Sequence, residues 1–397
     1  MTEPIAIAPR RWLNKAVVGF GLASFLSDAG HEAATSALPA LLAAFGAPPA
    51  ALGIIEGVSD AAASFAKLAG GFWADRPERR KPIAVLGYLV TGLSTGAYGL
   101  ATAWHAVFAA RATGWFARGI RGPARDAMLA DAVPPEAIGR AFGFHRAFDT
   151  AGAVAGPLIA SLFIGLVPLR WVFGISLIPG VLASLVFALL VTAQQPHGRE
   201  TLAFWKSVGA LPPAFRRFLG AVFLFGLGDF ARTLLILRAT QLLAPSRGAA
   251  AAGIAILLYA FHNALYALAS YPVGALADRL SPRALLIAGY ALGALTAGLA
   301  AFTGPSLPLL ALLFAVAGLT LAFVDTLEGT VTARLVGSEL RGTAYGVLAT
   351  VNGIGDLISS SAIGIAWSLL GPVPAFSAAG ILCFLGAVVI AAGVRRG

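Results

Sequence analysis

The chain has 397 residues, of which 58% are apolar and only 12% are charged. A soluble protein carries about 25% charged and about 45–50% apolar residues, so this composition excludes an ordinary globular protein and predicts a protein of the lipid bilayer. The formal net charge of +10 does not indicate a nucleic-acid partner, because the cations lie in short loops between apolar runs and form no basic domain.

The first apolar run follows a short basic segment and is far longer than the core of a signal peptide, so we expect a retained membrane helix. A membrane span needs about 20 mostly apolar residues. The sequence therefore predicts an all-α integral membrane protein with twelve transmembrane helices. Breaks at Gly, Pro and charge clusters place them at about 14–44, 50–75, 82–103, 105–132, 140–166, 171–193, 216–243, 250–276, 284–303, 307–335, 343–368 and 372–393.

The loops between these runs differ in charge on the two sides of the membrane. Seventeen Lys and Arg residues fall on the side of the N-terminus, and only Arg170 and Arg247 fall on the other side. Because cytoplasmic loops carry the excess of cations, we expect both termini in the cytoplasm, in a bacterial inner membrane. The longest loop, 194–215, is predicted to link an N-terminal six-helix bundle, 1–193, to a C-terminal one, 216–397.

An internal repeat relates the two predicted bundles. A shift of 274 − 71 = 203 residues superposes two separate places in the chain without a slip. Such agreement indicates a duplication of six helices. The matched pairs include Gly71/Gly274, Asp75/Asp278, Arg76/Arg279, Arg80/Arg283, Glu136/Glu339 and Gly139/Gly342.

The stretch from Gly71 through Asp75 and Arg76 to Lys81 resembles the cytoplasmic loop motif between helices 2 and 3 of the major facilitator superfamily of transporters. Glu78 stands where that motif has its second Gly. The resemblance covers the whole chain, since the repeat, the helix number and the loop charges all fit it. It implies two parallel six-helix repeats with a substrate site at their interface near the midplane.

The fifth run carries a second motif. Gly143, Gly152, Gly156 and Pro157 have a spacing that resembles the helix-5 motif of proton-coupled antiporters of this superfamily. Small residues allow close approach of helices, and proline bends a helix. The resemblance favours export over import, although glycine-rich helix faces also pack in transporters of other kinds.

Ionisable residues inside membrane spans are costly, so they usually face a cavity, a partner or a proton path. In the first run, Asp28, His31 and Glu32 lie on one helix face. We predict that carboxylates and histidines at membrane depth couple transport to protons, and that arginines and polar groups bind substrate. The proton-coupling set is Asp28, His31, Glu32, Asp60 and Asp149, and the substrate-binding set is Arg111, Arg118, Arg146, Asn352 and Asp356.

A structural reading of the same charges stays open. Arg118 can pair with Asp28 or Asp149, and Arg111 can pair with Glu56, because their estimated depths are similar. In the C-terminal half, Asp229 and Arg232 are expected to pair, while Asp325 and Glu328 either act as a gate or lie at a solvated helix end.

The family resemblance also implies a mechanical role for the loops. Asp75 would sit near the positive N-terminus of the run 343–368, and Arg76 and Arg80 would pair with Glu136. Such contacts would close the cytoplasmic side and favour an outward-facing state. The second repeat would provide the same set through Asp278, Arg279, Arg283 and Glu339.

The favoured function is a monomeric, proton-coupled exporter of a small molecule such as a drug, a siderophore or a metabolite. A proton symporter importing an organic anion is the first alternative, suggested by the arginine stripe of the fourth run, and a non-transport receptor on the same scaffold is the second. No catalytic motif, phosphate loop or metal-ligand spacing is found, so we expect no enzyme, no cofactor and no metal site. The single cysteine, Cys383, excludes an intrachain disulfide.

Overall fold

The structure is a computed structural model that describes residues 12–74, 77–134, 137–192, 208–337 and 340–392. Within these ranges the chain is almost entirely helical, and one isolated bridge joins Ile164 to Val167. The first half contains α1 (Lys15–Ala44), α2 (Pro49–Ala74), α3 (Pro77–Ala97), the 3-10 helix η1 (Tyr98–Leu100), α4 (Trp104–Asp131), α5 (Ile138–Phe163) and α6 (Leu169–Leu190). The second half contains α8 (Pro213–Gly226), α9 (Arg232–Arg247), α10 (Ala250–Arg279), α11 (Pro282–Phe302), α12 (Leu307–Leu335), α13 (Arg341–Leu370) and α14 (Pro372–Ala392).

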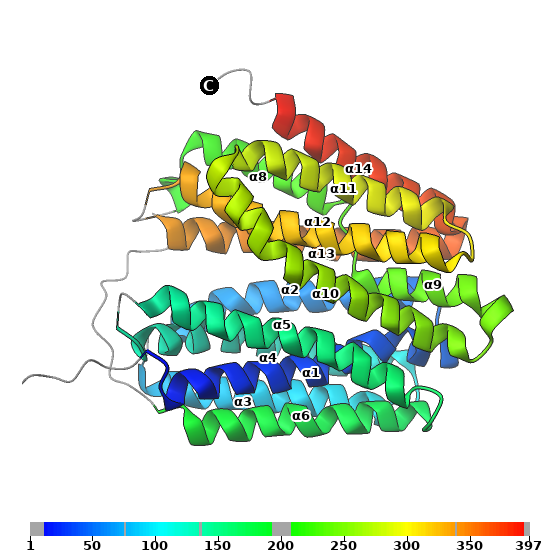
Figure 1. The fold of residues 1–397 in the computed structure, drawn as a ribbon, viewed down its shortest axis with the longest axis horizontal. Helices are drawn as coiled ribbons and strands as arrows, with labels where there is room; N and C mark the ends of the chain where they lie inside the picture. Colours follow the sequence, from blue (N-terminus) through cyan, green and yellow to red (C-terminus); the bar gives the residue numbers. More distant parts are fainter. Residues whose placement is uncertain (1–11, 75–76, 135–136, 193–207, 338–339, 393–397) are drawn as a thin grey trace, which may run out of the picture.

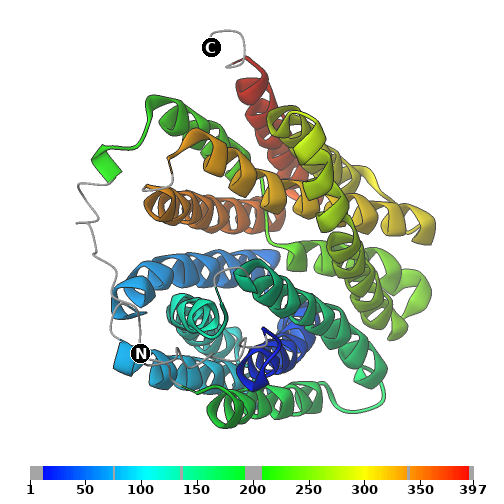
Figure 2. The ribbon, with the colours of Figure 1, turned by 60° about the vertical axis from the view of Figure 1, so that its left-hand side comes forward.

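The helices form two groups (Figures 1 and 2). In the first group, α1 packs along α5 and α6, and α4 packs along α2 and α3. In the second group, α12 packs along α10 and α11, and α14 packs along α11 and α13. Counting α8 and α9 as one interrupted span gives the predicted all-α fold of two six-helix repeats. The predicted domain limits stay a prediction, because residues 193–207 of the linker lie outside the described ranges.

The seventh predicted span, 216–243, was wrong as a continuous helix, because α8 ends at Gly226 and α9 begins at Arg232. A Cβ atom on Gly228 would collide with the carbonyl oxygen of Ala379 in α14, so the backbone passes where only glycine fits. Two serines of α13 bind the backbone groups that the break frees: Ser359 donates to the carbonyl of Asp229 at 2.6 Å, and Ser360 accepts from the N–H of Ala231 at 3.0 Å. Irregular backbone at membrane depth is stable only with such partners.

The two halves meet along two helix pairs, α2 with α13 and α5 with α10. Glycines allow the first pair to approach closely. A Cβ atom on Gly57 would lie 2.7 Å from the carbonyl oxygen of Leu357, and one on Gly364 would lie 2.8 Å from that of Pro49. The Oγ of Ser368 at the end of α13 accepts from the N–H of Ala50 at the start of α2.

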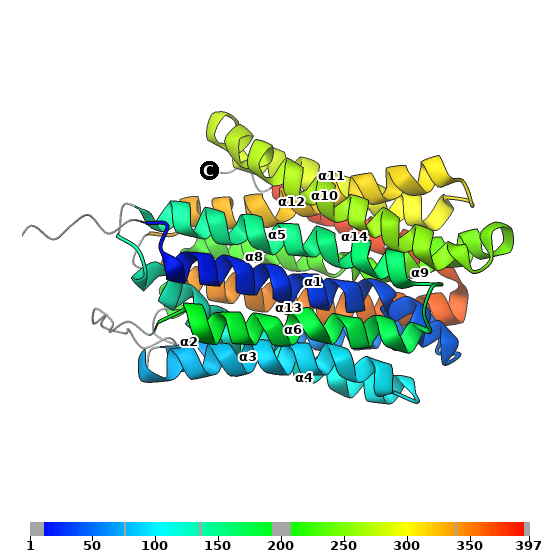
Figure 3. The same cartoon turned by 60° about the horizontal axis from the view of Figure 1, so that its bottom comes forward.

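The apolar core shows at which end the halves are packed together. Both described chain ends, at the start of α1 and the end of α14, lie at the same end of the molecule, on the left in Figure 1. At the opposite end one cluster joins both halves, for example Leu38 and Ile55 to Leu234 and Leu235. Toward the chain termini the core divides into one cluster for each half. Among the described residues, the halves therefore share an apolar core only at the end away from the termini. Figure 3 shows α9, which contributes to this shared core, at the end away from the start of α1.

Seven segments of the described chain are long and apolar enough to cross a membrane by length and composition: Glu78–Leu100, α6, α10, α11, α12, α13 and α14. The other long helices, α1, α2, α4 and α5, each carry several ionisable residues along their length, and the break divides α8 from α9. The shortfall against twelve predicted spans thus falls on helices with several ionisable residues and on the interrupted span.

Candidate functional site

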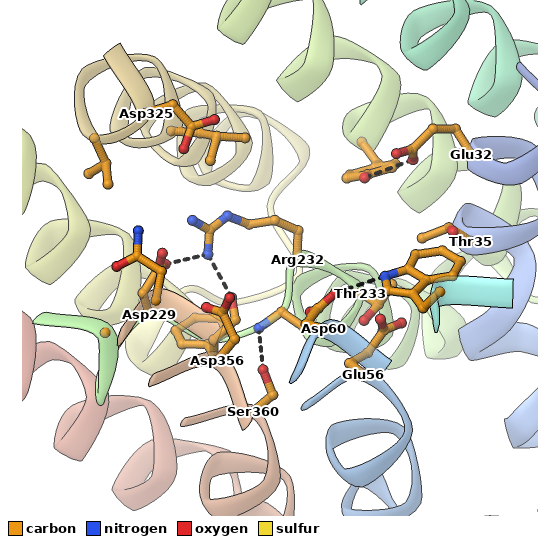
Figure 4. Close-up of a pocket in the computed structure, with 18 of the residues that line it drawn as sticks. Glu32, Thr35, Glu56, Asp60, Asp229, Arg232, Thr233, Asp325, Asp356 and Ser360 are labelled. Atoms are coloured by element: carbon orange, nitrogen blue, oxygen red, sulfur yellow. Dashed lines mark hydrogen bonds and ion pairs between the residues drawn. The ribbon is translucent and has the colours of Figure 1, made fainter. Parts of the chain in front are cut away.

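A cavity of about 320 Å³ lies between the two halves, near the middle of the helices (Figure 4). Residues of α1, α2 and α4 line one side of it, and the α8–α9 break, α9, α10, α12 and α13 line the other. Its lining is strongly acidic, with seven carboxylates against two guanidiniums and one histidine. The carboxylates are Glu32, Glu56, Asp60, Asp229, Asp325, Glu328 and Asp356, and the basic groups are Arg111, Arg232 and His31.

Arg111 is held by a buried ion pair. Its side chain is 1% exposed, and its Nη2 and Nε donate to Glu56 Oε2 at 2.6 and 3.1 Å. Its Nη1 donates to the hydroxyl of Thr35 at 3.2 Å, and its guanidinium lies 3.9 Å from the centre of the Trp115 ring. Three helices thus fix this guanidinium, while Glu56 Oε1 has no hydrogen-bond partner among the described residues.

The polar face of α1 lies against α4. Arg118 Nη1 lies 3.1 Å from Asp28 Oδ1 and 2.8 Å from Nδ1 of His31. His31 Nε2 in turn lies 3.4 Å from Glu32 Oε1. A continuous series of charged and polar side chains therefore connects Arg118 to the cavity wall. His31 and Glu32 line the cavity, whereas Asp28 and Arg118 do not.

Asp60 and Asp356 face the cavity where α2 packs against α13. The indole N–H of Trp115 donates to Asp60 Oδ1 at 2.8 Å. The carboxylate of Asp356 forms no hydrogen bond or ion pair with any residue in the described ranges, although Asp60, Asp229 and Arg232 are near enough to interact with it electrostatically.

The break between α8 and α9 supplies a second ion pair. Arg232 Nη1 lies 2.7 Å from Asp229 Oδ1 and donates to the carbonyl of Phe230 at 2.6 Å. The expected pairing of these two residues is confirmed. The hydroxyl of Thr233, which follows in α9, is buried and has no partner among the described residues.

The carboxylates of α12 are bound by neutral donors. Tyr290 and Asn352 donate to the two oxygens of Glu328 at 2.7 and 2.8 Å. The hydroxyl of Tyr266 donates to Asp325 Oδ2 at 2.9 Å. Neither carboxylate forms an ion pair with a guanidinium in the described structure, so both belong to the excess of carboxyl groups around the cavity.

Two hydrogen bonds cross between the halves beside the cavity. Tyr259 of α10 donates to Glu32 Oε2 of α1 at 3.0 Å, and Asn263 of α10 donates to the carbonyl of Ala153 in α5 at 2.8 Å. These contacts connect an acidic group of the cavity directly to the packing of one half on the other.

The remaining predicted site residues lie away from the cavity lining. Arg146 is exposed and lies 3.4 Å from Asp149 within α5. Glycines of the helix-5 motif meet α1: a Cβ atom on Gly152 would collide with the carbonyl of Phe25, and one on Gly156 would lie 2.6 Å from that of Ala29, whereas nothing lies within 4 Å of Gly143. Pro157 lies inside α5.

The predicted loop contacts are only partly within the described residues. Asp75, Arg76, Glu136 and Glu339 lie outside them. Arg80 forms an ion pair with Asp131 at 2.8 Å, at the end of α4. Asp278 and Arg279 are exposed, and Arg283 donates to the carbonyl of Ile390 within its own half. No bridging role between the halves follows from these contacts.

Sequence reasoning missed most of the neutral partners of the acids, namely Tyr259, Trp115, Tyr266 and Tyr290. It placed Arg121 beside the arginine stripe of the fourth run but did not foresee its partners: the buried guanidinium donates to Ser27 Oγ at 3.1 Å and lies 3.8 Å from the centre of the Tyr88 ring. Across the described ranges, no group of three or more His, Cys, Asp or Glu side chains is placed to hold a metal ion.

Comparison with known proteins agrees with this architecture. The chain matches the model of the Major Facilitator Superfamily at residues 20–246 and again at 219–396. It is 31% identical over 363 residues to an uncharacterized MFS-type transporter of Methanocaldococcus jannaschii, covering 90% of each chain.

Solved structures share the fold at low sequence identity. A bacterial homolog of the human lysosomal transporter Spinster has a TM-score of 0.78 at 19% identity, and 96% of each chain is covered. The nucleoside transporter NupG also has a TM-score of 0.78, at 15% identity, over 96% of this chain and 100% of that one. The chain therefore belongs to the Major Facilitator Superfamily and is an integral membrane transporter of small molecules, not an enzyme.

Proposed function

We propose that the protein is a proton-coupled secondary active transporter that works by alternating access and exports a small organic molecule. The observation that carries the proposal is the acidic cavity between the halves. Seven carboxylates and two guanidiniums line one chamber at membrane depth, and both guanidiniums are already paired, Arg111 with Glu56 and Arg232 with Asp229.

Protons are the simplest counter-charge for the remaining carboxylates. Acidic residues inside membrane spans commonly form proton relays in transporters, because like charges in a low-dielectric site repel each other unless they bind a cation. Glu32, Asp60 and Asp356 reach the cavity directly. Asp28, His31 and Arg118 extend this network into the N-terminal half, where Asp149 lies close to Arg118 and Asp28.

The packing of the halves supports alternating access. Apolar packing closes only the end away from the chain termini, and the glycine contacts of α2 with α13 belong to that closure. Opening this end and closing the other would expose the same cavity to the opposite side, as expected of two repeats that rock about a central site.

The alternative of organic-anion import has less support. The arginine stripe of α4 that suggested it is occupied within the protein: Arg111 binds Glu56, Arg118 lies against Asp28, and Arg125 binds Asp126 at 2.9 Å. A second candidate, a receptor without transport, has no observation in its favour. The spacing of Gly143, Gly152 and Gly156 with Pro157 supports export.

We further propose a monomer in a bacterial inner membrane with both termini in the cytoplasm. The charge difference between the loops supports this orientation, with seventeen cations on one side and two on the other. In this orientation the end that lacks a common apolar core faces the cytoplasm, which is where an exporter takes up its substrate.

Inverted membrane vesicles test this function. Vesicles from cells that produce the protein, and from cells that do not, are incubated with a cell extract under an imposed pH gradient, and their contents are compared by mass spectrometry. An exporter accumulates its substrate in inverted vesicles, and a protonophore abolishes the accumulation. Accumulation in right-side-out vesicles alone would refute export, and accumulation that survives the protonophore would refute proton coupling.

A further inference from the structure

Asp60 and Asp356 form a pair of carboxylates contributed by opposite halves. They lie on the contact between α2 and α13. Gly353, one turn before Asp356, shows how close the two helices are: an added Cβ atom there would collide with the side chain of Ser64 and lie 3.9 Å from the carbonyl oxygen of Asp60. Both side chains face the cavity (Figure 4), and they interact electrostatically with each other. Two like charges at a contact between halves push the halves apart unless a cation lies between them.

The described surroundings do not supply that cation in full. Both guanidiniums of the cavity already form ion pairs with other carboxylates, Arg111 with Glu56 and Arg232 with Asp229. Lys67, on the same face of α2 and exposed, interacts electrostatically with both carboxylates but forms no ion pair with either. Across the whole lining, seven carboxylates against two guanidiniums leave an excess of 7 − 2 = 5 acidic groups.

The form of the cavity fits an organic cation better than a metal ion. Its volume of about 320 Å³ is that of a small organic molecule, and no three ligand side chains converge on one point among the described residues. Trp115, Phe225 and Phe230 contribute aromatic surface, which binds ammonium groups favourably. Thr233 lines the same cavity, and its buried hydroxyl has no partner among the described residues.

We propose that the molecule carried by this transporter is an organic cation whose positively charged nitrogen binds between Asp60 and Asp356. This inference rests on the transport function proposed above and adds its substrate class. A cation in this position bridges the two halves, so its binding stabilises the contact of α2 with α13, and its release leaves two carboxylates that repel each other or take up protons. Substrate and protons therefore compete for one pair of acids.

Binding of matched probes to the purified full-length protein tests the charge requirement. Tetraphenylphosphonium is compared with the anion tetraphenylborate, which has the same shape, and benzylamine is compared with neutral benzyl alcohol. We expect each cation to bind at least about tenfold more tightly than its counterpart, which is about 1.4 kcal/mol, and to release protons to a weakly buffered solution. If neither cation binds more tightly than its counterpart, the proposal is overturned.

Conservative variants test the position of the site. Asp60→Asn and Asp356→Asn are each expected to weaken binding of the cations at least about tenfold. Asp325→Asn removes one carboxylate from the same cavity, but from α12, which is not part of the contact of α2 with α13, and where Tyr266 binds it; we expect a loss below about threefold. Equal losses in all three variants would indicate a diffuse effect of cavity charge and would overturn the pairing of Asp60 with Asp356.

A tethered cation tests the same point without depending on a probe. Asp356→Lys places an ammonium beside Asp60, so cation binding should be lost while the halves stay closed at the end away from the termini. Distances between fluorophores attached at Leu166 and Gly304, in loops of opposite halves at that end, report the closure. Separation of the labels in this variant would contradict a bridging role.

Failure of this inference is distinguishable from failure of the proposed function. If a pH gradient drives transport of neutral or anionic substrates only, proton coupling stands and the proposal that the substrate is an organic cation is refuted. If cation binding depends on Asp60 and Asp356 but no transport is driven by a pH gradient, the proposed binding site stands and proton coupling is refuted. Displacement of the probes by Na⁺ or Mg²⁺ at equal concentration would show a site for inorganic cations and overturn the substrate class.

Discussion

Removal of one partner of the Arg111–Glu56 pair should destabilise the protein more than removal of both. Arg111→Met leaves the Glu56 carboxylate buried without a counter-charge, and it also removes the bond to Thr35 and the contact with the Trp115 ring. Breaking a buried ion pair in this way costs about 3–5 kcal/mol of unfolding free energy. Glu56→Gln leaves the guanidinium buried and should cost nearly as much, reduced by the two hydrogen bonds that an amide oxygen in the place of Oε2 still accepts from Arg111.

The double variant Arg111→Met/Glu56→Gln carries no buried charge at this place. Replacing a buried ion pair by neutral groups of similar volume is often close to neutral, so we expect a loss below about 2 kcal/mol. Unfolding of the purified variants in mixed micelles, followed by circular dichroism during a titration with sodium dodecyl sulfate, measures the three free energies. Arg146→Met is the control, because its pair with Asp149 is 3.4 Å long and 70% of its side chain is exposed, which predicts a loss below about 1 kcal/mol.

The same variants decide between the two readings of Arg111. If the guanidinium serves only the fold, the double variant recovers transport along with stability. If Arg111 binds substrate, transport stays low in the double variant although the protein is stable. A double variant that is no more stable than either single variant would refute the reasoning, because the buried charges would then not depend on each other.

Three further predictions concern the contacts that hold the halves and the broken helix. Gly53→Ala places a Cβ atom against the carbonyl of Ser360, so it should separate α2 from α13 and reduce transport strongly, whereas Gly298→Ala, with nothing within 4 Å, should change neither. Tyr259→Phe removes a bond to Glu32 worth about 1.5–3 kcal/mol, so the end away from the termini should open more often, by at least about tenfold, as reported by the labels at Leu166 and Gly304. Ser360→Ala leaves the N–H of Ala231 unsatisfied and should cost about 1–3 kcal/mol in the micelle titration. Ser161→Ala removes only an exposed hydrogen bond from a serine hydroxyl to its own helix and should cost less than about 0.5 kcal/mol. If a control variant, Gly298→Ala or Ser161→Ala, had the same effect as the variant it is paired with, the contact in question would be contradicted. Unchanged label distances in Tyr259→Phe would contradict the role of its bond to Glu32.

Much of the fold follows from patterns that act over short distances along the chain. Apolar runs of about 20 residues place the helices, and the repeat at an offset of 203 residues relates the halves. The break between Gly226 and Arg232 does not follow, because the sequence of the run contains no proline and its glycines also occur inside the other helices. It depends on Ser359, Ser360 and Ala379, which are about 130–150 residues further along the chain and reach the break only in the folded protein.

The ion pairs around the cavity were predictable in part, whereas the neutral partners of the acids were not. Arg111 with Glu56 and Asp229 with Arg232 are pairings that the sequence offered and the structure contains. Helical spacing places Asp28, His31 and Glu32 on one face, and it does so correctly because that spacing is local. Spacing cannot tell which neighbouring helix meets that face. The partners Tyr259 and Trp115 therefore became visible only in the packing, as did the contact of Arg80 with Asp131.

The position of the acids explains how one cavity can serve both binding and closure. Glu32 is held across the halves by Tyr259, and Asp356 faces Asp60 across the contact of α2 with α13, so a change of charge at either place acts directly on the interface. The backbone of the break between α8 and α9 is bound to α13 through the hydroxyls of Ser359 and Ser360, so this part of the cavity wall is also joined to the helix that carries Asp356. A proton or a bound cation therefore needs no long path to change the conformation, since the groups that bind it are the groups that join the halves.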